Sequence, residues 1–272
     1  MTLLRREDVV VGGTRLSVLT AGDCGGEPML LLHGTFWSRV WQPVLPALGR
    51  RLSCWALDFP GFGRSDGELR PEQATVPALA AVAVAAADAL GLDTFHLAAH
   101  DIGGGVAQHL AAHFPDRVRR MVLMNAVMFD SWPVPAVARF ADPRVRAATT
   151  AEDLVRARRE AMAKAVARPL SPEEVDDYVS PWHDAARARS WTAMAAAADP
   201  SYTLDLVPAL ARQAVPTRLV WGRDDTFQKI EQARRYVAEI PGSDLVEVAG
   251  RHIPTEDAPE AVAAAMLAHL GG

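Results

Sequence analysis

The feature that most constrains this chain is an apolar strand that runs into a cluster of glycines. Residues 95–99 form a short apolar segment, glycines occupy 103–105, and apolar residues recur at helical spacing over 106–111. A strand, a sharp turn and a helix, with small residues around one polar side chain, describe a nucleophile elbow. The polar residue at the turn is Asp101. Because small residues let such a turn hold its central residue in a strained conformation, Asp101 is the candidate nucleophile.

Strands and helices alternate along most of the chain. Apolar segments predict strands within residues 9–14, 15–20, 29–32, 54–57, 95–99, 120–124, 217–221 and 245–248. Helical patterns cover residues 41–48, 77–90, 228–240 and 260–270. This alternation requires a mostly parallel, doubly wound sheet with helices on both faces, so the predicted fold class is α/β.

The pattern changes between residues 127 and 213. Alanine and arginine dominate there, several prolines interrupt the segment, and no strand is apparent. We interpret residues 127–213 as an inserted helical lid, or cap, on a core made of residues 1–126 and 214–272. Ligands of such sheets bind at the carboxyl edge of the strands, which this lid is expected to cover.

Composition and charge exclude several kinds of partner. The net charge of −5 offers no basic face for a phosphate backbone, so no nucleic acid is expected. Residues 1–8 lack the apolar core of a signal peptide, and the apolar run 77–87 is too short to span a bilayer. Cys24 and Cys54 fit no metal spacing and need not pair. We expect a cytoplasmic monomer or homodimer that takes a small-molecule substrate and has no membrane association, metal or cofactor.

Three further signals stand where a nucleophile at Asp101 would need them. Residues 222–225 (GRDD) directly follow one predicted strand, residues 250–252 (GRH) follow another, and residues 33–35 (HGT) follow a third. With the glycine-rich turn at 58–65, they place nucleophile, acid and histidine in that chain order. On these motifs the chain resembles the α/β-hydrolases over essentially its whole length.

The acid at the elbow, preceded by His100, resembles the epoxide hydrolase and haloalkane dehalogenase branch of that superfamily. The resemblance implies a catalytic triad of Asp101, Asp225 and His252. Asp225 is preferred to Asp224 because the family's acid falls three residues after the turn glycine.

An aspartate nucleophile restricts the reaction. It is already charged at neutral pH, and its attack on an ester carbonyl would give a reactive anhydride. Attack on a saturated carbon that bears a strained oxygen or a halide gives an ordinary alkyl ester instead. We therefore expect His252 to activate the water that cleaves this ester, with Asp225 orienting the imidazole. The backbone N–H groups of Thr35 and Ile102 are the expected oxyanion hole.

The choice between epoxide and halide depends on the lid. Haloalkane dehalogenases usually carry a tryptophan after the nucleophile, where this chain has Ile102. Epoxide hydrolases use acidic O–H donors, usually two tyrosines, and the lid offers Tyr178, His183 and Tyr202, of which His183 with Tyr202 is the preferred pair. The family's usual early-lid tyrosine is absent, since residues 139–141 read RFA.

Further pocket candidates are Phe36, Trp37 and Trp182. The sequence thus favours an Asp-nucleophile hydrolase that opens a small, mostly apolar epoxide. Haloalkane dehalogenation, or a lyase, cyclase or rearrangement reaction on the same fold, stays as an alternative. A non-catalytic ligand receptor is a weaker alternative, because the intact triad argues against it.

The remaining histidines and charges have simpler interpretations. His33 and His100 are expected to support the backbone near the site rather than to react. The charged run 156–160 is expected to form the solvated face of a lid helix.

Overall fold

An eight-stranded sheet runs through the centre of the computed structural model, which describes residues 3–22 and 25–271. The strands are β1 (Arg5–Val11), β2 (Thr14–Ala21), β3 (Glu27–Leu32), β4 (Leu52–Leu57), β5 (Phe95–Asp101), β6 (Val118–Ala126), β7 (Thr217–Gly222) and β8 (Ser243–Val248). Their order across the sheet is β1-β2-β4-β3-β5-β6-β7-β8. β1 and β2 pair antiparallel, as do β2 and β4, and every other neighbouring pair is parallel.

The order of the strands places β3 beside β5, at the point where the chain reverses its direction of progress across the sheet. Ala99 of β5 pairs with Leu32 of β3 on one side and with Leu123 of β6 on the other. Every residue of β5 is buried, as expected of a central parallel strand, and its side chains are apolar apart from His96, His100 and Asp101. A crevice forms where connections leave a parallel sheet in opposite directions. The loops after β3 and β5 therefore meet there.

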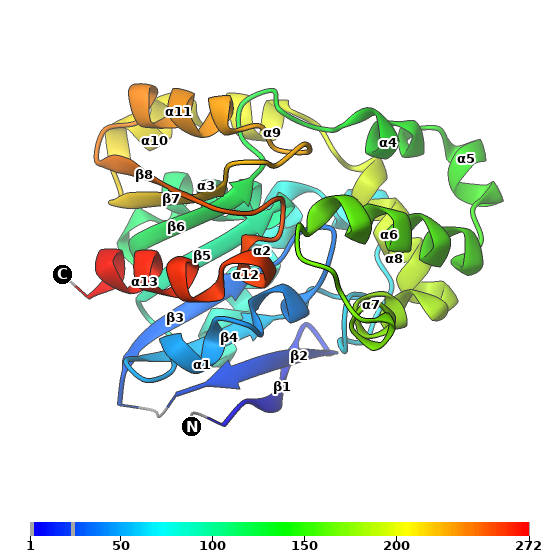
Figure 1. The fold of residues 1–272 in the computed structure, drawn as a ribbon, viewed down its shortest axis with the longest axis horizontal. Helices are drawn as coiled ribbons and strands as arrows, with labels where there is room; N and C mark the ends of the chain where they lie inside the picture. The colour runs from blue at the N-terminus through cyan, green and yellow to red at the C-terminus, as the bar shows by residue number, and fades with distance from the viewer. Residues whose placement is uncertain (1–2, 23–24, 272) are drawn as a thin grey trace.

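Helices cover both faces of the sheet (Figure 1). The core helices are η1 (Ser38–Trp41), α1 (Leu45–Leu48), η2 (Pro71–Gln73), α2 (Val76–Ala89), α3 (Ile102–His113), η3 (Pro115–Arg117), α10 (Val207–Gln213), α11 (Ile230–Glu239), α12 (Pro254–Asp257) and α13 (Pro259–Leu270). α1 and α13 contact each other on one face, while α3 packs with α2 and α10 on the other. α11 packs against β7 and β8.

Residues 127–213 contain helices and no strand. The elements are α4 (Pro135–Ala138), η4 (Arg139–Ala141), α5 (Pro143–Ala148), α6 (Ala151–Ala165), α7 (Pro172–Val179), η5 (Ser180–His183), α8 (Ala185–Ala196) and α9 (Ser201–Leu204), followed by α10. Helices α4 to α8 gather beyond one end of the sheet (Figure 1). α9 and α10 instead contact α3 of the core. We refer to α4–α8 as the lid.

Two elements differ from the sequence prediction for identifiable reasons. The helix expected over 41–48 is two short helices, η1 and α1, because Pro43 and Pro46 lack the N–H groups that a continuous helix needs. β1 begins at Arg5 rather than Val9, since its first residues are exposed polar ones on an edge strand and give no apolar signal.

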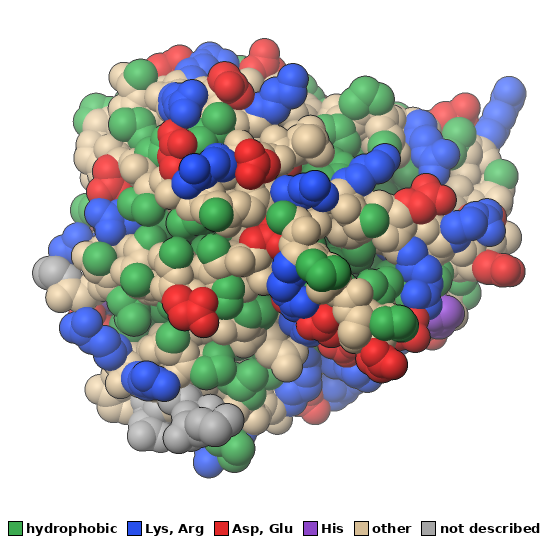
Figure 2. Space-filling model, in the orientation of Figure 1, with side chains coloured by type: hydrophobic (Ala, Val, Ile, Leu, Met, Phe, Trp, Pro, Cys, Tyr) green, Lys and Arg blue, Asp and Glu red, His purple; other side chains and the backbone are tan. Residues whose placement is uncertain are grey.

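The surface mixes charges of both signs. On the face drawn in Figure 2, basic side chains are frequent over the lid, and acidic ones lie among them. Among the described residues, no helix combines the length and apolar character needed to cross a membrane. Cys54 is buried in β4, and Cys24 lies outside the described residues.

Candidate active site

The elbow is built as a strained turn between β5 and α3. Asp101 has φ 55° and ψ −126°, a backbone conformation that costs about 1–3 kcal/mol in a non-glycine residue. The glycines after it allow α3 to pack close to its neighbours. A Cβ on Gly103 would lie 2.6 Å from the carbonyl oxygen of His33, and one on Gly104 would lie 2.2 Å from Cβ of Ala126. The strain is therefore held in place by close packing on two sides.

One oxygen of Asp101 is bound and the other is free. Oδ2 accepts hydrogen bonds from the backbone N of Thr35 at 2.9 Å and from its Oγ1 at 2.6 Å. Within the described residues, no hydrogen bond reaches Oδ1. Gly34 makes this approach possible, because a Cβ there would lie 2.6 Å from Oδ2 and 2.5 Å from the backbone N of Ile102. Thr35 and Ile102 thus both have a backbone N at this end of the carboxylate.

His252 and Asp225 reach the elbow from the loops after β8 and β7. Nδ1 of His252 lies 2.9 Å from Oδ2 of Asp225, and Nε2 lies 3.9 Å from Oδ2 of Asp101. All three side chains are buried. Asp225 also accepts hydrogen bonds from the side chain of Asn125 at 2.7 Å and from the backbone N of Phe227 at 2.7 Å. Asp225 therefore stays an acceptor, and Nδ1 of His252 carries the proton it accepts.

Asn125 is a positioning residue for which the sequence pattern gave no signal. It lies at the end of β6 with φ 40°, and its Oδ1 also accepts a hydrogen bond from Gly222 N at 3.0 Å. It thereby fixes the turn that carries Asp225. A lone asparagine after an apolar strand is too common for sequence alone to single it out.

His100 and His33 hold backbone rather than substrate. Nε2 of His100 donates to the carbonyl oxygen of His252 at 2.8 Å, and the two rings are 4.7 Å apart. Burial, together with the nearby charge of His252, lowers the pKa of His100 to about 4, so its ring is neutral. Nδ1 of His33 donates to the carbonyl oxygen of Gly34, while its Nε2 accepts from Phe59 N. Each ring therefore stabilises one catalytic loop.

The electrostatics of the triad favour an ionised nucleophile. Burial alone would raise the pKa of Asp101, but the charge of His252 and the hydrogen bonds from Thr35 together lower it. Burial likewise opposes a charged His252, but Asp225 and Asp101 outweigh it and raise the pKa of this histidine. Arg158 acts in the opposite direction on His252. Because the charge of Asp101 helps to raise the pKa of His252, this pKa should fall when Asp101 loses its charge.

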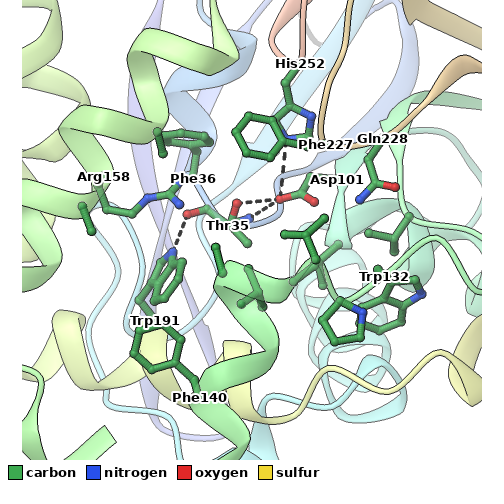
Figure 3. A pocket seen from close by; sticks show the side chains of 18 of the residues that line it. Thr35, Phe36, Asp101, Trp132, Phe140, Arg158, Trp191, Phe227, Gln228 and His252 are labelled. Atoms are coloured by element: carbon green, nitrogen blue, oxygen red, sulfur yellow. Dashed lines mark hydrogen bonds and ion pairs between the residues drawn. The ribbon is translucent and has the colours of Figure 1, made fainter. Parts of the chain in front are cut away.

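A cavity of about 140 Å³ lies between this triad and the lid (Figure 3). Its polar lining residues are Thr35, Asp101, Arg139, Arg158, Gln228 and His252. The rest of the wall is apolar and consists of Phe36, Ile102, Val127, Trp132, Pro133, Val134, Ala136, Val137, Phe140, Leu154, Ala157, Ala161, Trp191 and Phe227. Its size suits a small substrate. The indole N–H of Trp191 donates to the carbonyl oxygen of Thr35 at 2.9 Å, so the lid contacts the oxyanion loop directly.

The expected proton donors lie elsewhere. The Tyr178 hydroxyl donates to Glu256 at 2.7 Å, and burial, with the charge of Glu256, raises its pKa well above the usual value. His183 is exposed on η5, and Tyr202 is half-buried on α9. None of the three lines the cavity, which differs from the sequence expectation. The physical reason is that Glu256, a buried acceptor, holds the Tyr178 hydroxyl on the core side of the lid.

Only one of the three aromatic residues that were expected at the cavity lines it. Phe36 lines the cavity as expected, whereas Trp37 and Trp182 do not. The indole N–H of Trp37 donates to the backbone oxygen of Tyr178. Trp182 is buried behind the wall, with its ring 6.0 Å from that of Phe36. These two tryptophans support the cavity from outside.

Arg158 is one of several cavity residues, with Gln228 and Trp191 among the others, that were not predicted from the sequence. The run 156–160 was expected to be solvated, but Arg158 is only 7 % exposed and lines the cavity. It lies four residues after Leu154 and four before Met162, both buried on the same side of α6. The helical register could therefore have placed it inward. Among the described residues, no cluster of histidine, cysteine and carboxylate side chains could hold a metal ion.

The chain is similar to known proteins over most of its length. The profile of the alpha/beta hydrolase fold family matches residues 27–259. "Haloalkane dehalogenase 2" of Mycobacterium tuberculosis is 30% identical over 260 residues, which cover 90% of this chain and 88% of that protein. A 2-hydroxy-6-oxo-6-phenylhexa-2,4-dienoate hydrolase of Burkholderia cepacia is 24% identical over 257 residues, covering 85% and 82%. A haloalkane dehalogenase structure from Bradyrhizobium elkani superposes with a TM-score of 0.83 at 24% identity, covering 99% and 98%.

The fold and these matches over most of both chains define a class of enzyme. The chain belongs to the α/β-hydrolase fold family, in the branch that holds haloalkane dehalogenases and epoxide hydrolases. It is a hydrolase with an eight-stranded, mostly parallel sheet, as the elbow and the order of its motifs predicted.

Proposed function

We propose that this enzyme hydrolyses a carbon–halogen bond at a saturated carbon, with Asp101 as the nucleophile. The observation that carries the proposal is the asymmetry of the Asp101 carboxylate. Oδ2 is held by Thr35 at 2.9 and 2.6 Å and faces His252, whereas Oδ1 has no hydrogen-bond partner among the described residues. The similarity to proteins named as haloalkane dehalogenases supports the same chemistry.

In the first step, Oδ1 of Asp101 attacks the carbon that bears the halogen. A carbon–oxygen bond forms, the carbon–halogen bond breaks, and the halide leaves with the bonding electron pair. The product is an alkyl ester of Asp101. No proton moves, so this step needs an ionised carboxylate and no base.

In the second step, water cleaves the ester. Nε2 of His252 takes a proton from the water, whose oxygen attacks the carboxyl carbon of Asp101. The negative charge then develops on Oδ2, where the backbone N of Thr35 already donates. Collapse expels the alcohol oxygen, which takes the proton from His252 and leaves Asp101 as a carboxylic acid. This acid releases the second proton of the water to the solvent, and the carboxylate is restored. Organic halide and water thus give an alcohol, a proton and a halide ion.

The donors in the cavity favour a halide over an epoxide. An opening epoxide ring needs an acidic O–H, and among the described lining residues there is no tyrosine. A halide ion needs only N–H donors. Ser131 accepts a hydrogen bond from Met128 N and so donates to Oε1 of Gln228 at 2.8 Å. This orients the amide NH₂ of Gln228 toward the cavity, as Figure 3 shows.

The test traps the ester. The substitution His252→Gln removes the base, so we expect the alkyl-enzyme to accumulate during incubation with bromoalkanes and with epoxides. Intact-protein mass spectrometry distinguishes the two substrates. A halide-derived adduct adds an alkyl group less one hydrogen, whereas an epoxide-derived adduct adds the whole epoxide, and peptide mapping locates either one.

Two control variants make the outcome decisive. Asp101→Asn in the His252→Gln background should carry no adduct. His183→Gln changes an exposed histidine outside the cavity and should turn over without accumulating ester. An adduct that retains the epoxide oxygen would replace dehalogenation by epoxide hydrolysis, and the absence of any adduct on Asp101 would refute covalent catalysis.

A further inference from the structure

Arg158 is a buried cation without a partner. It extends from α6 into the cavity beside Thr35 (Figure 3) and is 7 % exposed. Its Nε and Nη2 atoms are buried and have no hydrogen-bond partner, and no carboxylate of the described residues lies within ion-pair distance. Burial of a charge without hydrogen-bond partners is costly, and here only aromatic faces and the charge of Asp101 offset part of that cost.

Aromatic rings surround the guanidinium of Arg158 and shield it from water. Its Cζ lies 4.1 Å from the ring centre of Phe36, 5.2 Å from that of Trp182 and 5.1 Å from that of Trp191. Aromatic faces attract a cation but offer no hydrogen-bond acceptor to its N–H groups. Burial lowers the pKa of Arg158 to about 10, which still leaves it charged at neutral pH, and Asp101 opposes the shift. Its Nε and Nη2 groups are covered by the cavity wall, so an anion in the cavity would reach them once the side chain turns.

The edge of Arg158 formed by Nε and Nη2 has no hydrogen-bond partner. In other arginines of this molecule the same edge binds a carboxylate. Three other arginines each donate from Nε and Nη2 to the two oxygens of one carboxylate, at distances of 2.6–3.0 Å. The pairs are Arg15 with Asp66, Arg189 with Glu68 and Arg218 with Asp244. The two parallel N–H donors of a planar guanidinium match the two oxygens of a carboxylate better than they match a spherical halide ion. Since no hydrogen bond fixes Arg158, its side chain can turn this edge toward a ligand.

We propose that Arg158 binds the carboxylate of the substrate, so that the enzyme takes short halogenated carboxylic acids rather than simple haloalkanes. The inference rests on the proposed function for the reacting end of the molecule. The carboxylate pairs with Arg158, the short alkyl chain lies along the apolar wall, and the halogen-bearing carbon reaches Oδ1 of Asp101.

Charge balance in the cavity supports this assignment. An anionic substrate beside the ionised Asp101 would be repelled strongly in a buried site. Arg158, in the same cavity, offsets that repulsion while the nucleophile stays charged. The charged groups that face the substrate are then Asp101, Arg158, His252 and, at the exposed margin, Arg139. The mostly apolar substrate expected from the sequence thus gains one anionic end.

The first experiment measures binding without chemistry. Butanoate has no leaving group, and Trp182 and Trp191 next to Arg158 provide a fluorescence signal. We expect saturable binding of butanoate to the wild-type enzyme, about 100-fold weaker binding to Arg158→Met, and unchanged binding to Arg156→Gln. Arg156 is the matched control because it is an exposed arginine on the same helix. Sodium chloride and sodium bromide are titrated in parallel.

The second experiment measures turnover of 4-bromobutanoate, its amide and 1-bromobutane. We expect the wild-type enzyme to prefer the carboxylate, and Arg158→Met to lose about 100-fold more in kcat/KM for it than for the two neutral substrates. Equal losses for all three substrates would show that Arg158 only supports the charge of Asp101, and would overturn the proposal.

The two experiments separate the possible failures. If butanoate does not bind, or if halide ions bind at Arg158 in its place, the carboxylate site is refuted whatever the chemistry. If butanoate binds through Arg158 but no ester forms on Asp101 of the His252→Gln variant, the carboxylate site stands and the proposed dehalogenation is refuted.

Discussion

Gly34 allows the carboxylate of Asp101 to lie close to the backbone N atoms of Thr35 and Ile102. The substitution Gly34→Ala would place a Cβ 2.6 Å from Oδ2 of Asp101 and 2.5 Å from Ile102 N, so one of these groups must move. We expect a loss of about 1–3 kcal/mol in the free energy of unfolding, as for other overpacked sites, and a large loss of kcat. Thermal denaturation and steady-state kinetics measure the two effects.

The matched control is Gly25→Ala, where a Cβ would meet no atom within 4 Å. It should leave both stability and rate near the wild-type values. A Gly34→Ala enzyme with wild-type kcat would show that the contact between Thr35 and Asp101 is dispensable.

His252 should give the second half-reaction its pH dependence. In the free enzyme Asp225 and Asp101 raise the pKa of His252 despite its burial. Ester formation removes the charge of Asp101, so this pKa falls and the imidazole is released to act as a base. Hydrolysis then slows as the pH falls through the remaining pKa, whereas alkylation continues because the pKa of Asp101 is lowered. Acid pH should therefore make the ester accumulate.

Rapid mixing with substrate, followed by acid quench and mass spectrometry, tests this at roughly pH 5 and pH 8, on either side of the ordinary histidine pKa. Asp225→Asn removes one raising charge and should move the acid limb to lower pH. An ester fraction that is the same at both values would contradict the assignment of His252 as the base.

At the scale of elements, the lid is joined to the loop that carries His252. Glu256 in α12 is buried and accepts from Arg39 at 2.8 Å and from Tyr178 at 2.7 Å. Its other oxygen pairs with Arg168, at the start of the segment that leads into α7. Glu256 is the fourth residue after His252. The network therefore fixes the lid and the catalytic base relative to each other.

The substitution Glu256→Gln should weaken this connection. It leaves the buried Arg39 without its full partner, and we expect a loss of about 3 kcal/mol in stability, which corresponds to roughly 5–10 °C in Tm. Differential scanning calorimetry measures it. Glu68→Gln, in an exposed pair with Arg189, is the control and should cost less than about 1 kcal/mol. Equal effects of the two substitutions would show that the network is not a structural joint.

The sequence predicted elements better than it predicted contacts between them. The elbow at Asp101 and the turns that carry Asp225 and His252 were identifiable because local spacing specifies a strand, a turn and a helix. The inward direction of Arg158 was readable in principle from the register of α6, but a charged residue in a charged run gives no apolar signal.

The positions of the lid side chains were beyond sequence reasoning. Whether Tyr178 faces the substrate or Glu256 depends on how a helix packs across the core, which no local pattern encodes. The same holds for Asn125, whose role follows from the pairing of β6 with β7. At the scale of the whole molecule, the fold and the candidate triad are predictable from spacing, whereas the lining of the cavity depends on packing.

The uneven attachment of the lid determines where molecules enter and leave. Its α7 side is tied to the core through Glu256, whereas neither α4 nor α5 contains a buried residue, and α4 borders the cavity. The cavity thus has one wall tied to the core and one formed by a helix without buried residues, and we expect the second to open more readily. We expect substrate to enter and products to leave on the α4 side of the cavity. The exposed Arg139 lies there, and its positive charge would attract an incoming anion and contact a departing halide ion.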